Sequence, residues 1–345
     1  MLKLKVLPVY QGDCMILTVP MEDGEIRVMV DAGTKKSYVK GSLKKELMEG
    51  KIVHLLILTH TDDDHIGGFL KYLEDEKRLV SLFRKVWFNT GALISKELNL
   101  PEKAESTIHI SDADDLKMSV RNSRTIEGLM QEEGILAEFI LKAPDTHTFG
   151  PLKFTMLSPN EEDLITFYKD WELESNKPLE VSSRHDSSYS IEELLNKNFK
   201  EIGSLANRAS MGFLIEQGDI CMLFMGDAFP SVISNNLKKL GYSSTNKLQL
   251  NFVKVSHHGS ASGISPELLS MIDCNHFIIS SDGSNGLPTK ECLSRIVTHR
   301  PDKIILYFNY KNEKTEGIFL EDDFKKYNFE IIYLTEDNNY TILMN

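Results

Sequence analysis

The sequence HTDDDH at residues 60–65 follows the apolar run Ile52–Leu58 after a single threonine. A continuous apolar run of this kind is typical of a strand that is covered on both faces, as in an α/β protein. Imidazole and carboxylate groups are both good ligands for divalent metals. The chain must therefore fold so that a buried strand carries a group of metal-binding side chains at its end.

The side chains of this motif cannot all reach one ion. Because side chains alternate in direction along an extended segment, we expect His60 and Asp62 to meet one ion, and Asp64 and His65 to turn toward a second. A single aspartate at this point would be interpreted as a cap of the following helix, which we expect to begin near Phe69 and to continue to Leu79. Four ligand-type side chains in six positions argue against that interpretation.

Three other apolar strands end in similar side chains. Asp31 follows the run VMV, Asp227 follows LFMG, and the pair His257-His258 follows FVKV and one serine. Ligand sites in α/β folds gather at such strand ends. Asp31 or Asp227 alone could equally be a helix cap, but together with the histidine-rich motif they predict one shared site.

Strands precede helices in each half of the chain, which predicts an α/β fold in which two sheets pack face to face with helices outside, a four-layer αββα sandwich. We expect residues 1–345 to form a single domain. The segments at about 91–147 and 160–206 fit the pattern poorly and are interpreted as insertions, which could act as binding elements or be decorative. The run Ile331–Leu343 is expected to form a closing hairpin.

The charge and hydropathy of the chain limit its partners. Asp and Glu outnumber Lys and Arg by 51 to 39, for a net charge of −12. A broad basic face for nucleic acid is not supported, because such binding depends on neutralised phosphates. We see no secretion signal and no apolar run near the length of about 20 residues that crosses a membrane, so we expect a cytoplasmic protein that does not bind membranes.

Taken together, these motifs resemble the metallo-β-lactamase superfamily. More narrowly, the chain resembles the hydrolase domain of the competence-type DNA-uptake channel and its free-standing relatives. The shared features span nearly the whole chain outside the two insertions, and they are the turn QGD at residues 11–13, THTDDDHIGG at 59–68, Asn207 with Ser210, GDA at 226–228, HHGS at 257–260 and the tail YLTE at 333–336.

The resemblance implies a set of roles for the residues of the site. One ion would be bound by His60, Asp62 and Asp227, and the other by Asp64, His65, Asp227 and one of His257 or His258, with His258 favoured. Asp64, Asp227 and His257 would act closest to the chemistry, with His257 facing the substrate. The supporting or substrate-facing residues would be Asp31, Asp13, Asn207 and Ser260.

Three departures from the family pattern bear on the site. Asp62 stands where much of the superfamily has a histidine, so one ion would have more oxygen ligands. No further histidine ligand is evident, since His147 and His185 lie in or beside the insertions and are interpreted as surface residues; Asn207 could take that place. Leu287 stands where relatives often have the histidine of a Gly-His-Pro sequence.

The function implied is that of a metal-dependent hydrolase with a hydroxide held between two divalent ions, zinc first and manganese as the alternative. The first hypothesis for the substrate is a phosphodiester, including nucleic acid. The alternatives are a small carboxylic ester or thioester, or a regulatory protein that binds metal and works through its insertions. The sequence predicts no particular protein partner.

Overall fold

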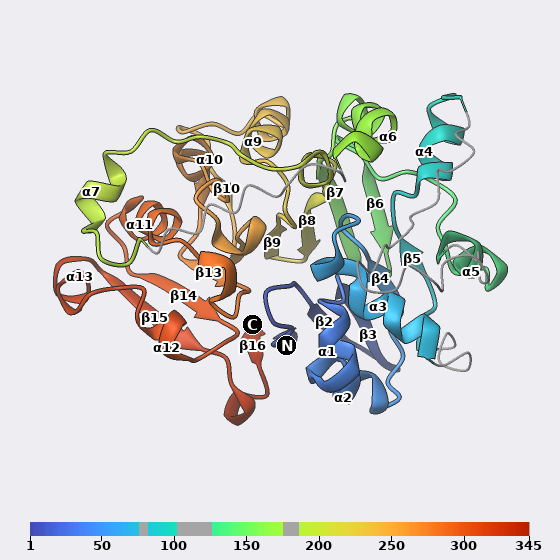
Figure 1. Cartoon of the computed structure of the whole chain (residues 1–345), viewed down its shortest axis with the longest axis horizontal. Coiled ribbons are helices and arrows are strands. Elements are labelled where there is room, and N and C mark those ends of the chain that lie inside the picture. Colours follow the sequence, from blue (N-terminus) through green and yellow to red (C-terminus); the bar gives the residue numbers. More distant parts are fainter. Residues whose placement is uncertain (76–81, 102–125, 175–185, 345) are drawn as a thin grey trace.

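The structure, a computed structural model of the chain, describes residues 1–75, 82–101, 126–174 and 186–344 (Figure 1). Two sheets form the centre of the molecule. In the six-stranded sheet the order is β16-β1-β2-β3-β4-β5. Its strands are β1 Leu2–Val6, β2 Met15–Met21, β3 Gly24–Val30, β4 Leu55–Ile57, β5 Val86–Trp87 and β16 Thr341–Met344.

In the eight-stranded sheet the order is β15-β14-β13-β11-β9-β8-β7-β6. Its strands are β6 Thr146–Phe149, β7 Leu152–Ser158, β8 Gly212–Gln217, β9 Ile220–Phe224, β11 Phe252–Lys254, β13 His276–Ile279, β14 Ile304–Phe308 and β15 Phe329–Tyr333. A separate pair joins β10 Leu248–Gln249 to β12 Ile272–Asp273. Strands β9, β11, β13, β14 and β15 run parallel to one another, so their carboxyl ends lie at the same edge of the sheet.

Helices cover the outer face of each sheet (Figure 1). Those of the first half are α1 Lys35–Lys40, α2 Ser42–Met48, α3 Asp63–Asp75, α4 Gly91–Glu97, α5 Ile126–Glu132 and α6 Glu161–Glu174. Those of the second half are α7 Ile191–Leu195, α8 Leu205–Arg208, α9 Pro230–Lys239, α10 Pro266–Met271, α11 Lys290–Thr298, α12 Glu313–Glu316 and α13 Glu321–Lys326. No helix within the described ranges is both long and apolar enough to cross a bilayer.

Three apolar clusters hold these layers together. The cluster between the two sheets joins residues such as Leu17 of β2 to Phe154 and Phe213 of the other sheet. A second cluster packs Phe69 of α3 against the outer face of the six-stranded sheet. A third packs α9, α10 and α11 against the outer face of the eight-stranded sheet. The predicted four-layer α/β sandwich is confirmed.

Two predicted elements differ from the structure. The last strands do not form a hairpin: β15 pairs with β14 in one sheet, whereas β16 pairs with β1 in the other, and a turn at Glu336–Asn338 connects them. The alternating pattern of both strands is correct, but alternation says nothing about which sheet a strand joins. The helix expected from Phe69 begins at Asp63 instead, inside the metal-binding motif; the expected end at Leu79 lies outside the described residues.

The two segments interpreted as insertions carry several of these elements. The segment 91–147 contains α4 and α5 and enters β6 at its end, and β6 pairs with β7 at the edge of the eight-stranded sheet. The segment 160–206 contains α6, α7 and the start of α8. That they are insertions, and that the chain is one domain, remain predictions.

Candidate metal centre

Side chains from both sheets meet at the carboxyl ends of β4, β9 and β11. His60 lies beyond β4, His65 lies in the first turns of α3, Asp227 lies beyond β9, and His258 lies beyond β11. All four residues are buried. The atoms His60 Nε2, His65 Nε2, Asp227 Oδ1 and His258 Nε2 have no hydrogen-bond partner. Buried polar atoms are rarely left without a partner, so the arrangement calls for a group that would bind these atoms.

A divalent metal ion fits this set of atoms. His60, His65 and Asp227 each offer a ligand atom, and these three atoms lie within 4.8 Å of one another. Asp13, His65 and His258 form a second such group, so His65 lies between the two. Nitrogen and oxygen atoms that each bind one zinc ion at about 2 Å are about 3–4 Å apart, and Asp227 lies 3.3 Å from His65 Nε2 and 3.8 Å from His60 Nε2, within that range.

Asp227 lies at the middle of the cluster. Its Oδ1 is 3.3 Å from His65 Nε2, and its Oδ2 is 3.8 Å from His60 Nε2 and 4.0 Å from His258 Nε2. Burial raises the pKa of this carboxyl, but the charges of the surrounding histidines lower it well below its usual range. The carboxylate therefore lies within 4.0 Å of ring nitrogens of three histidines.

The interpretation of Asp227 as a helix cap is wrong. Helix α9 begins at Pro230 and its N-cap is Phe229, with no capping side chain. The backbone N–H of Asp227 donates to Ser210 Oγ at 3.0 Å, and Asn207 Nδ2 donates to Asp227 Oδ2 at 3.1 Å. Asn207 thus holds Asp227 Oδ2; that it takes the place of the absent histidine ligand remains a prediction.

The early start of α3 places Asp64 and His65 in a helical turn. The backbone N–H groups of His65 and Ile66 both donate to the carbonyl of Asp62, at 2.9 and 3.1 Å. A Cβ atom at Gly68 would lie 2.1 Å from the carbonyl oxygen of Ala32. Glycine is required there because the helix packs directly on the chain that follows Asp31.

Asp31 orients His65. Its Oδ2 accepts a hydrogen bond from His65 Nδ1 at 2.8 Å, and Thr59 donates to both oxygens, from its backbone N–H at 2.7 Å and its hydroxyl at 2.9 Å. Because Nδ1 of His65 is used in this way, its Nε2 is left free for an ion. His60 Nδ1 lies 3.0 Å from Thr59 Oγ1 and 3.2 Å from Ser210 Oγ, so its Nε2 is likewise directed toward Asp227.

Several predicted residues line the mouth of the site. The side chain of Asp62 is 41% exposed, with Oδ2 3.4 Å from His60 Nε2. Asp64 is 27% exposed, and its Oδ2 lies 3.1 Å from His258 Nε2. His257 is 32% exposed with Nε2 3.9 Å from Asp227 Oδ2, and burial lowers its pKa. Ser260 is directed elsewhere, with its Oγ 3.3 Å from Ser262 Oγ.

Of the two histidines set aside as surface residues, only His147 lies within the described residues, and it does not join the site. The ring of His147 stacks on Phe139 at 4.8 Å and lies 5.6 Å from Trp87, so it is half-buried in an aromatic cluster rather than on the surface. Its position in β6 explains the burial. His185 lies outside the described residues.

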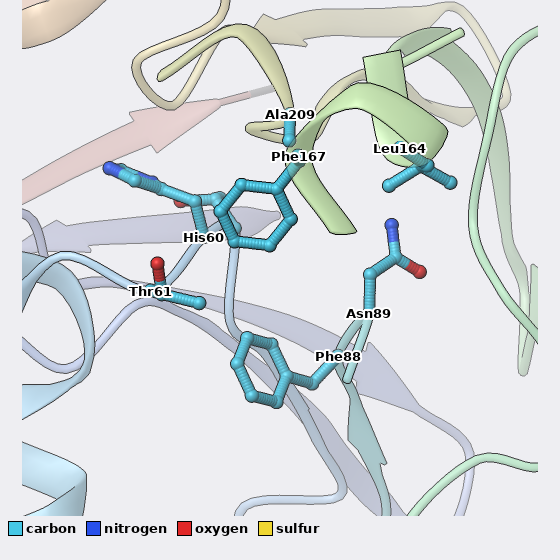
Figure 2. A pocket seen from close by; sticks show the side chains of 8 residues that line it. His60, Thr61, Phe88, Asn89, Leu164, Phe167 and Ala209 are labelled. Carbon is cyan, nitrogen blue, oxygen red and sulfur yellow. The ribbon is translucent and has the colours of Figure 1, made fainter. Parts of the chain in front are cut away.

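A small pocket beside His60 and Thr61 was not expected from the sequence (Figure 2). Phe167 and Leu164 of α6, Phe88 and Ala209 form apolar walls. Asn89 also lines the pocket, but its side-chain amide is hydrogen-bonded to the backbone of Leu141. Its Nδ2 donates to the carbonyl of Leu141 at 2.8 Å, and its Oδ1 accepts from the backbone N–H of Leu141 at 2.7 Å. The pocket is therefore a small space with mostly apolar walls next to His60.

Without bound ions, protons compensate the buried carboxylates. Burial lowers the pKa of His258, but Asp227 and Asp13 raise it more, to about 10. The pKa of His65 is also raised well above its usual value by Asp227 and Asp31. Since a metal must displace these protons to bind the ring nitrogens, metal binding and protonation compete.

This competition predicts how the metal-free protein responds to pH. The folded pKa of His258 exceeds the ordinary value of about 6.5, so its contribution to stability is complete below about 6.5 and is lost as the pH rises through about 10. We expect the melting temperature in excess chelator to fall between pH 7 and 10, and zinc binding at pH 7 to release protons. Thermal unfolding measures the melting temperature, and calorimetry in two buffers measures the release of protons. A His258→Gln variant should show a smaller fall, and a wild-type melting temperature that rises over this range would contradict the assignment.

Comparison with known proteins places these observations in a family context. Residues 7–166 match the family model described as "Metallo-beta-lactamase superfamily". Curated protein sequences give no match. The chain has the metallo-β-lactamase fold, a mixed α/β arrangement with sheets flanked by helices.

Solved structures similar to this chain share little sequence with it. A putative metal-dependent hydrolase from Parabacteroides distasonis is 9% identical, with 96% of this chain and 93% of that chain covered and a TM-score of 0.39. The metallo-beta-lactamase fold protein YhfI from Bacillus subtilis is 10% identical, with 96% and 95% covered and a TM-score of 0.38. CmlA, a diiron beta-hydroxylase from Streptomyces venezuelae, is 10% identical with a TM-score of 0.41; 96% of this chain but only 53% of CmlA is covered, so the chain spans about half the length of that protein.

Proposed function

We propose that this chain, whose family match and fold support its place in the metallo-β-lactamase superfamily, is a two-metal hydrolase that cleaves phosphodiester bonds. Enzymes of this superfamily are generally metal-dependent hydrolases. The observation that carries the proposal is the convergence on Asp227 of three buried histidine Nε2 atoms that have no hydrogen-bond partner, those of His60, His65 and His258. When bound, two divalent ions supply Lewis-acid chemistry and a water of lowered pKa at neutral pH.

The side chains of the site have distinct tasks in such a reaction. His60, His65, Asp227 and His258 would hold the ions, with Asp62 and Asp64 added from the exposed mouth. His257 lies at the same mouth with a lowered pKa, so at neutral pH it is uncharged and can donate one hydrogen bond to an anionic substrate oxygen. Asp31 and Asn207 keep His65 and Asp227 in place.

The choice of a phosphodiester rests on the narrower resemblance to the competence-type branch and on the charge of the substrate. Two divalent ions at an open mouth attract an anionic phosphoryl group even on a protein of net charge −12. The proposal includes a cytoplasmic location for this protein.

A substrate panel tests the proposal. Metal-replete protein is assayed with bis(p-nitrophenyl) phosphate, p-nitrophenyl acetate and an acyl thioester, alongside elemental analysis of bound metal. We expect two ions per chain and metal-dependent cleavage of the diester. Cleavage of the ester or thioester alone would favour the other branches of the superfamily. Two bound ions with no cleavage of any substrate would favour a regulatory protein.

The presence of Asp62 predicts the metal preference. Aspartate supplies an oxygen ligand where a histidine nitrogen is common in the superfamily, and oxygen ligands suit harder cations. We expect metal-free protein reloaded with manganese to be at least as active as protein reloaded with zinc. An Asp62→His variant should shift the preference toward zinc. Full activity with zinc and none with manganese would refute this prediction.

A further inference from the structure

Lys254, in the middle of the apolar sequence FVKV, is fully buried at the end of β11. Its Nζ forms an ion pair with Asp13 Oδ2 and donates to the carbonyl of Val255 at 2.9 Å. The side chains of Lys254 and Asp13 are both 0% exposed. A buried lysine is costly unless it is paired, and nothing in the hydrolytic chemistry described above uses this pair.

The other oxygen of Asp13 is directed at a metal ligand. Asp13 Oδ1 lies 3.3 Å from His258 Nδ1, which also lies 3.1 Å from the carbonyl oxygen of Ser280. Both neighbours of Nδ1 are acceptors, so this nitrogen carries the proton. The free Nε2 on the opposite edge of the ring lies 3.1 Å from Asp64 Oδ2. Lys254, Asp13 and His258 therefore form a chain that ends at the metal site.

The turn that carries Asp13 also contacts the start of α3, where Asp64 lies. The backbone N–H of Asp13 donates to the carbonyl of Asp64 at 3.2 Å. A Cβ atom at Gly12 would lie 2.0 Å from that same oxygen, so only glycine permits this approach. The hydroxyl of Ser280 donates to the carbonyl of Gly12 at 2.8 Å. The turn thus contacts Asp64 at the start of α3 on one side. On the other side it contacts Ser280, whose carbonyl oxygen lies beside His258.

Asp13 could in principle be a ligand itself, since it lies within ligand distance of His65 and His258. Its contacts argue otherwise. One carboxylate oxygen is taken by Lys254, and the other faces Nδ1 of His258, on the edge of the ring away from the atom that would bind an ion. An ion bound by Nε2 therefore lies on the far side of the ring from Asp13.

We propose that Lys254 is a positioning residue for the metal site: by pairing with Asp13 Oδ2 it holds Asp13 Oδ1 against His258 Nδ1 and so orients His258 toward its ion. This inference rests on the proposed two-metal site. Acceptors of this kind behind a ligand histidine typically change metal affinity by about 10–100-fold when they are removed. Lys254 is one residue further from the ion and acts through Asp13.

The test compares Asp13→Asn, Lys254→Met and the double variant in the full chain. The affinity of the protein for each of the two zinc ions is measured by competition with a chromophoric chelator. Folding is followed by thermal unfolding. We expect each single variant to bind the ion at His258 about 10–100-fold more weakly, with a smaller change for the other ion. Because both residues act through one pair, the double variant should be no weaker than the weaker single variant. A folded Lys254→Met variant with unchanged affinity for both ions, or losses that add fully in the double variant, would overturn the inference.

Lys290→Met is the matched control. Lys290 is also fully buried and pairs with a carboxylate, Asp323, at 2.7 Å, but it lies at the start of α11 and holds the carbonyl of Tyr189. We expect this variant to be less stable and to keep both zinc affinities. An equal loss at the His258 ion would mean that general loosening explains the effect, and would overturn the inference.

Two further outcomes keep the test decisive. If the single variants do not fold because one charge is left unpaired, the neutral double variant decides: the same weakening supports the inference, and wild-type affinity overturns it. If the wild-type chain itself binds fewer than two ions, the proposed function fails. If it binds two and the Lys254 and Asp13 variants bind both with unchanged affinity, only the inference fails.

Discussion

Replacing Asp227 with asparagine is expected to abolish hydrolysis while leaving the chain folded. An amide keeps the volume of the side chain but loses the charge that lets one group contact both ions, and the Asn207 contact to Oδ2 does not depend on that charge. At least one ion should be lost, and turnover should fall on the order of a thousandfold or more, as when an enzyme loses its main electrostatic stabilisation. Turnover, bound metal and the unfolding curve are the measurements.

Asp273→Asn provides the control for this substitution. Asp273 ends β12 and pairs with Arg300, away from the ligand atoms, and its side chain is 35% exposed. We expect it to retain both ions and full turnover. A folded Asp227→Asn chain with two ions and near-normal turnover would remove Asp227 from the metal site.

Removal of the ions is expected to have the second-largest effect. Ions that bind the folded chain and not the unfolded chain stabilise it by about 2.7 kcal/mol at a concentration about 100 times their dissociation constant. For a chain of this size that corresponds to a fall of roughly 5 °C or more in melting temperature when a chelator removes them. Activity should disappear in the same titration, because the ions lower the pKa of the attacking water in the proposed reaction.

Restoration distinguishes this effect from damage by the chelator. Adding back excess zinc or manganese should recover both the melting temperature and the activity. A chain whose melting temperature and activity are the same with and without chelator, in samples shown by elemental analysis to be metal-free, would contradict the metal centre altogether.

The parts of the fold that were predictable are those that one local pattern specifies. The buried run before His60 does form a strand, β4. The start of α3 was missed because Asp63, Asp64 and His65 look like loop residues, yet the first turn of a helix accepts acidic side chains readily. The final hairpin was wrong because strand pairing over the length of the chain depends on tertiary packing rather than on local alternation.

The residues of the site can be divided in the same way into those that the sequence predicts and those that it does not. Residues with metal-binding side chains at strand ends could be named from the sequence, and the structure brings His60, His65, Asp227 and His258 together. Lys254 could not be assigned a role, because a charged residue in an apolar strand signals burial without naming its partner. Phe167 was missed for another reason: an aromatic residue in a polar segment gives no sign that its helix lies against the end of a different strand.

The pairing of β1 with β16 bears on how the protein is made. Leu2 pairs with Met344, so nearly the whole chain separates two neighbouring strands. During synthesis at the ribosome, β1 emerges long before β16, and its outer edge remains open until the segment after Asn339 has been translated. Open strand edges invite pairing with other chains. We therefore expect nascent or shortened chains that lack β16 to aggregate, and to depend on chaperones more than the full-length protein does.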